Sequence, residues 1–297
     1  MNVLIVAAAY VFTQVVIPGA SSISPWGIND KEQVVVQTDI GSGVYHRGTF
    51  TPLPPPPAGL QVLGYGINNA GVVVGSAVAA DGHEQGFILT GAAYKFFSRP
   101  GWPNTLARAT GNSGLITGLS YALDEHGEFG IPSAGFVYDP RTETFTDVTP
   151  PGSDGFRIFA QGINKAGVIS GSARDSNIGP YAFVWQMDTF ASGKPGVTRF
   201  IDRIRIAAGF ARARGINDAG LITGFSADET DSTGVGFVGN SVHGFHLLTV
   251  PGATPENGGT VCQGINNLAQ VTCGFNDGVP GNDHAFIGSP EGRGEEN

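Results

Sequence analysis

The stretch that decides the fold is Gly-Ile-Asn-Asn-Ala-Gly at residues 66–71, because it recurs along the chain. Gly162–Gly167 and Gly215–Gly220 each differ from it at one position, and three looser copies bring the number to six. The copies begin at Gly27, Gly66, Ala109, Gly162, Gly215 and Gly264. Their starts are therefore 39, 43, 53, 53 and 49 residues apart. Internal repeats with a period of roughly 40–50 residues indicate a chain built from similar structural units.

Each copy opens a unit that reads as four short strands. An apolar run ending in glycine follows the motif, as in residues 72–75, and a variable loop leads to a small residue and phenylalanine, as in Gly86-Phe87. A last apolar run then leads to Pro-Gly. Four strands in such a repeat are typical of a β-propeller blade, whereas the coils of a β-solenoid are shorter and more uniform. The 46 Gly and 19 Pro, 65 of 297 residues, also argue against helices, which both residues disfavour.

The two ends of the chain complement each other. The sixth unit stops after Ala285–Gly288 and lacks a fourth strand, while Tyr10–Gly19 has the fourth-strand pattern and ends in Pro-Gly. Pairing these segments would remove two exposed sheet edges. We therefore predict an all-β, six-bladed β-propeller with four-stranded blades, its last blade closed by the N-terminal strand. This prediction makes residues 1–290 a single domain and residues 291–297 a disordered tail.

The repeat resembles a known family. Together with the Gly-Ile-Asn motif, the tripeptides His243-Gly244-Phe245 and His284-Ala285-Phe286 are similar to the HAF-type extracellular repeat of bacteria. Other units depart from the tripeptide, as in Gln85-Gly86-Phe87. The resemblance implies a propeller that is exported to the periplasm or beyond, although a cytoplasmic relative stays open. It implies no particular chemistry, so function must lie in what departs from the repeat.

The residues just before the motif are the clearest departure. First strands line the channel of a propeller, and the large residues at this position differ in kind from blade to blade. They are Trp26, Tyr65, Arg108, Gln161, Arg214 and Gln263. If the strands alternate with period two, the residues two positions earlier share the same side, and these include Phe159 and Arg212. A mixed ring of this kind suits one asymmetric small ligand.

These residues predict a binding site at the centre of the face that carries the second-to-third and fourth-to-first connections. Arginine side chains can hold a carboxylate, phosphate or carbonyl oxygen through paired N–H donors, which gives Arg108, Arg212 and Arg214 this role. Aromatic rings can form an apolar wall, the role expected of Trp26, Tyr65 and Phe159. Gln161 and Gln263 add amide groups. The alternative is that all these side chains plug the channel and bond to neighbouring blades.

A loop offers groups for proton transfer. The segment Asp124–Glu128 contains Glu125 and His126, side chains of the kind that act in general acid–base catalysis. With Arg108 and Arg214 polarising an oxygen, they would support a cyclisation, elimination or hydrolysis. A hydrophilic loop in contact with water is the plainer interpretation. The chain has no phosphate-binding loop or dinucleotide fingerprint, and we expect no metal or organic cofactor.

The charge balance bears on partners. The net charge is −9 and no basic run occurs, so nucleic acid is not expected to bind. The longest uncharged apolar stretch, Val3–Phe12, has ten residues and is too short to span a bilayer. We expect a monomer that binds a small molecule or a carbohydrate. The other functions to test are a non-catalytic glycan-binding propeller, which should repeat one binding set in its blades, and a protein-interaction propeller.

The two cysteines lie on consecutive strands of the last unit. Cys262 falls on its first strand and Cys273 on its second, with the midpoint inside the intervening turn. They should therefore be near neighbours across one hairpin, close enough for a disulfide. Two unbonded buried thiols are the alternative. A disulfide would fit an oxidising compartment.

Overall fold

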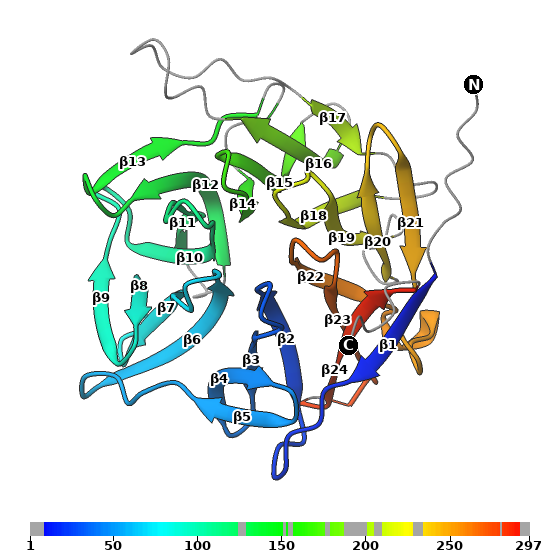
Figure 1. Ribbon diagram of the computed structural model, residues 1–297. Coiled ribbons are helices and arrows are strands. Elements are labelled where there is room, and N and C mark those ends of the chain that lie inside the picture. Colours follow the sequence, from blue (N-terminus) through cyan, green and yellow to red (C-terminus); the bar gives the residue numbers. More distant parts are fainter. Residues whose placement is uncertain are drawn as a thin grey trace.

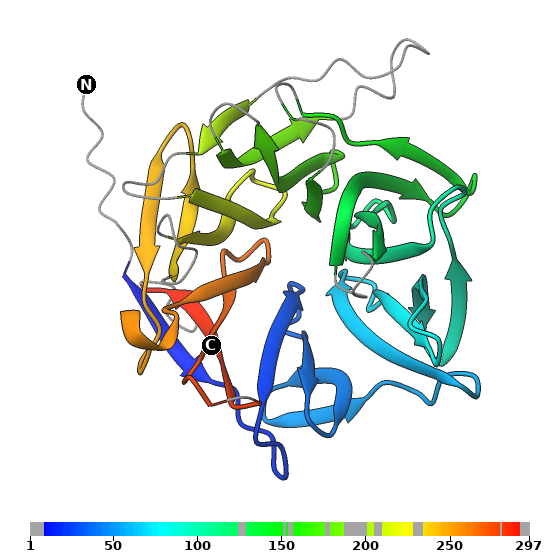
Figure 2. The same cartoon turned by 180° about the vertical axis from the view of Figure 1, so that it is seen from behind.

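The structure is a computed structural model that describes residues 9–123, 129–150, 153, 157–175, 179–186, 201–204, 210–227, 234–279 and 281–291. Within these ranges, 24 strands form six four-stranded antiparallel sheets. The sheets are arranged radially around a central axis, as both views show (Figure 1 and Figure 2). The predicted six-bladed propeller with four-stranded blades is confirmed.

Strand position in a blade follows sequence order from the axis outward. The innermost strands are β2 (Ile23–Ile28), β6 (Leu60–Ile67), β10 (Asn104–Thr110), β14 (Ile158–Ile163), β18 (Phe210–Ile216) and β22 (Val261–Ile265). The second strands are β3 (Val34–Thr38), β7 (Val73–Ala79), β11 (Ile116–Leu123), β15 (Val168–Asp175), β19 (Ile222–Ala227) and β23 (Val271–Asn276). The third strands are β4 (Gly41–His46), β8 (Glu84–Thr90), β12 (Phe129–Asp139), β16 (Gly179–Gln186), β20 (Gly234–Asn240) and β24 (Asp283–Pro290). The outermost strands are β5 (Thr49–Pro52), β9 (Ala93–Phe97), β13 (Thr144–Asp147), β17 (Ile201–Ile204), β21 (Gly244–Leu248) and β1 (Tyr10–Gln14). We number the blades 1 to 6 from the one that begins with β2.

The ring is closed by the N-terminal strand. In Figure 1, β1 runs beside β24 at the rim of blade 6, and the register pairs Tyr10 with Pro290 and Gln14 with Phe286. After β1 the chain stays attached, because the Val15 N–H donates to the Ala285 carbonyl at 2.8 Å. The predicted closure of the last blade by the other end of the chain is therefore confirmed.

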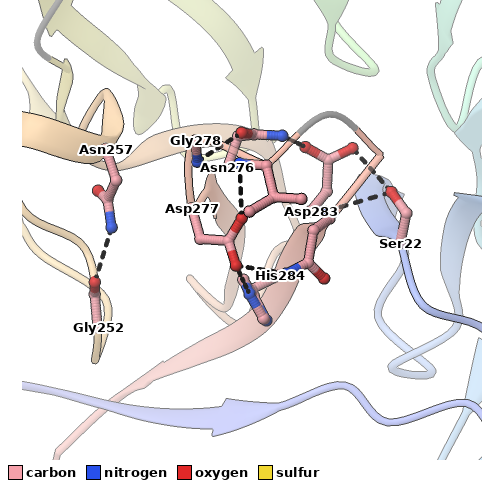
Figure 3. Close-up of polar contacts among 10 residues, drawn as sticks. Ser22, Gly252, Asn257, Asn276, Asp277, Gly278, Asp283 and His284 are labelled. Carbon is pink, nitrogen blue, oxygen red and sulfur yellow. Dashed lines mark hydrogen bonds and ion pairs between the residues drawn. The ribbon is translucent and has the colours of Figure 1, made fainter.

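A polar contact strengthens the same junction. The carboxylate of Asp283, at the start of β24, accepts a hydrogen bond from the Ser22 hydroxyl at 3.0 Å (Figure 3). The same carboxylate accepts from the Ser24 hydroxyl at 2.8 Å. Ser24 belongs to β2, so this carboxylate links blade 6 to blade 1. Beside it, the His284 Nε2 lies 3.4 Å from an Asp277 carboxylate oxygen. Both groups hold the β23–β24 connection in place.

The hydrophobic core is divided among the interfaces between blades. Each of the six core clusters combines residues from two neighbouring blades. In one of them, Val238 and Leu248 of blade 5 pack with Val271 and Phe286 of blade 6. Because a blade buries its apolar faces only against its neighbours, its stability depends on theirs. A 3₁₀ turn covers Pro255–Asn257, and no helix in the described ranges is long and apolar enough to span a bilayer.

The glycine that ends the second-strand motif makes room for the phenylalanine of the third strand. Gly75 lies opposite Phe87, and a Cβ at Gly75 would come 2.7 Å from that ring and 2.0 Å from the Leu63 carbonyl. The same pairing recurs in blades 3, 4 and 5, where the phenylalanine is fully buried. The recurring glycine and phenylalanine are therefore two halves of one packing unit.

In blade 6 a disulfide occupies the equivalent place. Cys273 lies opposite Phe286 on one side and opposite Cys262 on the other, and the two cysteines are bonded. Both are fully buried. In blade 5 the equivalent cross-strand pair is Ala213 with Gly224. The structure thus resolves the two alternatives for the cysteines in favour of the disulfide.

The asparagine of the Gly-Ile-Asn motif joins each blade to the next. In blade 5, the Asn217 Oδ1 accepts from the N–H groups of Ala219 at 3.1 Å and Leu221 at 2.9 Å, which fixes its own turn. Its Nδ2 donates to the Asn266 carbonyl of blade 6 at 3.0 Å, and the Asn266 Nδ2 donates to the Asn29 carbonyl of blade 1 at 3.0 Å. The last blade is therefore bonded to the first.

This circle of hydrogen bonds has one gap. Five blades supply a buried asparagine, and each donates to the following blade; the donors are Asn29, Asn68, Asn164, Asn217 and Asn266. Blade 3 has Gly111 at the equivalent position and has no side chain to bond to blade 4. We call the set of five the asparagine ring.

Replacing Asn217 by alanine should destabilise the protein by about 3 kcal/mol, because three hydrogen bonds in a buried site are lost. Urea unfolding measures this loss. The control is Asn240→Ala, whose side chain also accepts two turn N–H groups but has no bond to another blade among the described residues. Equal losses in the two variants would contradict a special role for the bond between blades.

Replacing the disulfide by Cys262→Ala/Cys273→Gly should leave the fold intact, because the pair reproduces the Ala213–Gly224 contact of blade 5. The free energy of unfolding should fall by about 3 kcal/mol, because without the cross-link the unfolded chain gains the conformational entropy of a loop of this length. Urea unfolding with and without dithiothreitol tests this. Reductant should destabilise the wild type and leave the variant unchanged, and an equal response would contradict the prediction.

Candidate functional site

The hub residues lie in β-bulges. In β10, Ala107 pairs with Gly118 and Ala109 with Thr117, so Arg108 is an extra residue without a partner in β11. The same register shift occurs in every blade, at Tyr65, Gln161, Arg214 and Gln263, and across Trp26 and Gly27 in blade 1. A bulge redirects the side chain that it carries. The uninterrupted alternation that we predicted for the first strands is therefore wrong at this position.

The bulges direct six side chains of four kinds into one cavity of about 90 Å³. Those side chains are Trp26, Tyr65, Arg108, Gln161, Arg214 and Gln263. Two other residues predicted to bind ligand, Phe159 and Arg212, do not line this cavity. From the hub it extends to the turns between first and second strands, such as the turn at Asn267. It therefore lies toward the face opposite to the one on which we expected the site.

Arg108 is the centre of the hub. Its Nε donates to the Gln161 Oε1 at 2.8 Å, and its guanidinium lies 4.2 Å from the Trp26 ring centre and 4.7 Å from that of Tyr65. The two rings meet edge to face at 4.8 Å. Desolvation lowers the pKa of Arg108 to about 10, and Tyr65 offsets part of that effect. In the part of the chain that the structure describes, no carboxylate lies within 4 Å of this guanidinium.

Two more polar atoms of the cavity wall are unsatisfied. The Trp26 Nε1 and the Gln263 Oε1 are buried and have no hydrogen-bond partner among the described residues. Leaving such groups unpaired costs roughly 1–3 kcal/mol each. Because both residues line the cavity, they offer one donor and one acceptor to whatever occupies it. Arg214 also lines the cavity and adds a second positive charge among the bulge residues; its guanidinium lies 5.4 Å from the Phe225 ring centre.

The outer end of the cavity is surrounded by five polar side chains that we call the lip. They are Asp30, Asn69, Asn112, Asp218 and Asn267. The Asn267 Nδ2 lies 2.9 Å from an Asp30 carboxylate oxygen and 3.0 Å from an Asp218 carboxylate oxygen, so it bridges the two acids. The lip side chains also accept backbone N–H groups of neighbouring blades, as the Asn69 Oδ1 does from Asp30 at 2.9 Å.

The alternative of a plugged channel is correct in part. The stack of Trp26, Arg108 and Tyr65 fills the channel on one side, and Gln161 bonds across to it from the neighbouring blade. The remaining space is small but lined by charges and unpaired groups. The residues proposed for proton transfer, Glu125 and His126, lie outside the described residues, and their catalytic role stays a prediction.

The sequence analysis missed a half-buried acid on the opposite face. Glu84 begins β8; burial raises the pKa of its carboxyl group, and a hydrogen bond from the Tyr121 hydroxyl offsets part of that increase. Its backbone N–H donates to the Asn104 Oδ1 at 2.9 Å, and its Oε2 is buried without a partner among the described residues. In sequence Glu84 resembles any acid at the end of a hydrophilic loop. Only the packing of blade 3 against blade 2 buries it.

Replacing Glu84 by glutamine should stabilise the protein at neutral pH and have little effect at pH 4. The folded state favours the protonated carboxyl, so stability of the wild type falls as pH rises from the ordinary glutamate pKa to the raised one. Urea unfolding at pH 4 to 8 measures the difference. The control Glu143→Gln should do the reverse, because Lys95 lowers the pKa of Glu143. A pH-independent effect of Glu84→Gln would contradict the assignment.

Comparisons with known proteins define the fold and leave the family open. No protein-family model matches the sequence, and no curated protein matches it. A gluconolactonase from Xanthomonas campestris is similar in structure with a TM-score of 0.55 and 9% identity, over 96% of this chain and 91% of the other. A lectin solved with alpha methyl fucoside has a TM-score of 0.46 and 12% identity, over 91% and 96% of the two chains. The six sheets of the structure define the class, a six-bladed β-propeller, and the similarity to the gluconolactonase agrees with that fold without assigning the HAF-type family.

Proposed function

We propose that this propeller binds a small organic molecule in the hub cavity, through a carboxylate or another oxyanion held by Arg108. The observation that carries the proposal is a desolvated guanidinium that faces a cavity and has no carboxylate within 4 Å among the described residues. A charge taken out of water without a counter-charge is costly. An anion in the cavity would supply that counter-charge.

The surroundings of Arg108 favour binding of a planar group. Gln161 and the rings of Trp26 and Tyr65 hold the guanidinium in one orientation before any ligand arrives. A fixed guanidinium presents two parallel N–H donors to a carboxylate. The unpaired Trp26 Nε1 adds a third donor, and the Gln263 Oε1 can accept from an N–H or O–H of the ligand.

The size of the cavity limits the ligand. Its volume of about 90 Å³ is enough for several water molecules. Pockets for drug-sized molecules are roughly 300–1,000 Å³. The hub is therefore suited to a molecule much smaller than a drug. Formate, acetate and bicarbonate are of this size.

Catalysis is a separate step in the proposal. Arg108 and Arg214 would polarise a bound oxygen, and Glu125 and His126 stay the predicted groups for proton transfer. The cavity wall itself supplies binding groups, which is why binding is the function that we propose first. Glycan or protein binding stays the alternative from the sequence.

We also infer a location outside the cytoplasm. The disulfide between Cys262 and Cys273 supports this, because structural disulfides persist in oxidising compartments. It agrees with what the repeat resemblance implies.

Arg108→Gln should abolish binding of small carboxylates, measured by calorimetry with formate, acetate and bicarbonate. We expect the affinity to fall at least tenfold, while the melting temperature of the unliganded protein changes little because an uncompensated charge is removed along with the stacking contacts. The control Arg47→Gln removes an exposed arginine that is paired with Glu32 and should leave binding unchanged.

Two outcomes would contradict the proposal. One is that none of the three acids binds the wild-type protein. The other is that Arg108→Gln lowers the melting temperature sharply while binding persists, which is the behaviour of a residue that only plugs the channel.

A further inference from the structure

The two ends of the hub cavity carry opposite charges. Arg108 lies at the inner end, among the bulge residues, and the Asp30 and Asp218 carboxylates lie at the lip, on the turns that follow the first strands. All three side chains line the same space of about 90 Å³. An occupant therefore meets positive groups, Arg108 and Arg214, at one end and two negative groups at the other.

The lip carboxylates are held by neutral donors. Asp30 accepts from the Asn267 N–H at 2.7 Å, and its other oxygen accepts from the side-chain amides of Asn69 and Asn267. Asp218 accepts from the Lys165 N–H at 2.8 Å and from the Asn267 side chain at 3.0 Å. Over the described ranges, no side-chain nitrogen of a lysine, arginine or histidine lies within 4 Å of either carboxylate; the Lys165 group that donates to Asp218 is its backbone N–H. Amide hydrogen bonds orient the acids and leave their charges in place.

This arrangement discriminates among small ions. A simple anion is attracted by Arg108 but repelled by the two carboxylates at the lip. A simple cation is attracted by the lip carboxylates but repelled by Arg108. A zwitterion gains at both ends and adds no net charge to the cavity. Building on the proposed function, we propose that the hub ligand is a small zwitterionic amino acid, with its carboxylate on Arg108 and its ammonium group toward Asp30 and Asp218.

The unpaired groups of the wall fit the same orientation. The Trp26 Nε1 is a donor at the level of Arg108 and can serve the carboxylate, and the Gln263 Oε1 at the same level can accept an N–H from the ligand. The small volume favours the smallest amino acids, such as glycine and β-alanine.

The test compares ligands of matched size on the wild-type protein. Calorimetry at pH 7 with glycine, β-alanine, acetate and methylammonium should show glycine or β-alanine binding at least tenfold more tightly than acetate, and methylammonium not binding. Acetate binding as tightly as glycine would overturn the zwitterion assignment and leave the proposed function standing. Binding of none of the four would overturn both.

Variants at each end separate the two charges. Asp218→Asn should lower glycine affinity at least tenfold and preserve or increase acetate affinity, whereas Arg108→Gln should abolish both. The control Asp81→Asn makes the same charge change at an exposed loop and should alter neither affinity. If Asp218→Asn disturbs the lip, Asp30→Asn provides an independent variant, and melting temperatures identify misfolding. Glycine affinity that survives both lip variants in folded protein would overturn the inference.

Discussion

The structure depends on a buried amide that serves two blades at once. The side chain of each ring asparagine closes its own turn through its oxygen and bonds to the next blade through its nitrogen, as Asn217 does toward Asn266. The last of these bonds returns to Asn29, so the set can be complete only when the circle closes. Closure in turn requires β1 to pair with β24. Local turn geometry and global ring closure are therefore one constraint.

The hub follows from the same stretch of chain. The glycine of the motif lets neighbouring blades approach closely at the axis; a Cβ at Gly264 would come 2.6 Å from the Trp26 carbonyl. The residue just before that glycine bulges out of the strand pairing. Because its side chain has no partner in the second strand, it can vary between blades without disturbing the sheet. A uniform ring of turns thus supports a non-uniform ring of side chains such as Arg108 and Gln161.

The charged and polar groups of the hub support our proposal that this small cavity holds a ligand. A guanidinium without a carboxylate partner, two carboxylates without a cation, and an unpaired donor and acceptor surround one space within the described residues. Each would be unfavourable if the space were packed with apolar groups. Their convergence is what distinguishes this cavity from the grooves between blades, such as the one beside His46 and Thr51.

The blade number, the four-stranded blades, the closing strand and the proximity of Cys262 to Cys273 could all be read from the sequence, because repeats and hairpins are set by local spacing. The residues of the hub could be named for the same reason. Their surroundings could not. The bulge at Arg108 is a detail of the pairing of β10 with β11 that the residue types do not reveal. The orientation of the cavity toward the lip and the burial of Glu84 arise where blades meet, and contacts between distant segments leave no periodic signal in the sequence. Only the tertiary structure determines which charged side chains lie beside a group of opposite charge and which do not.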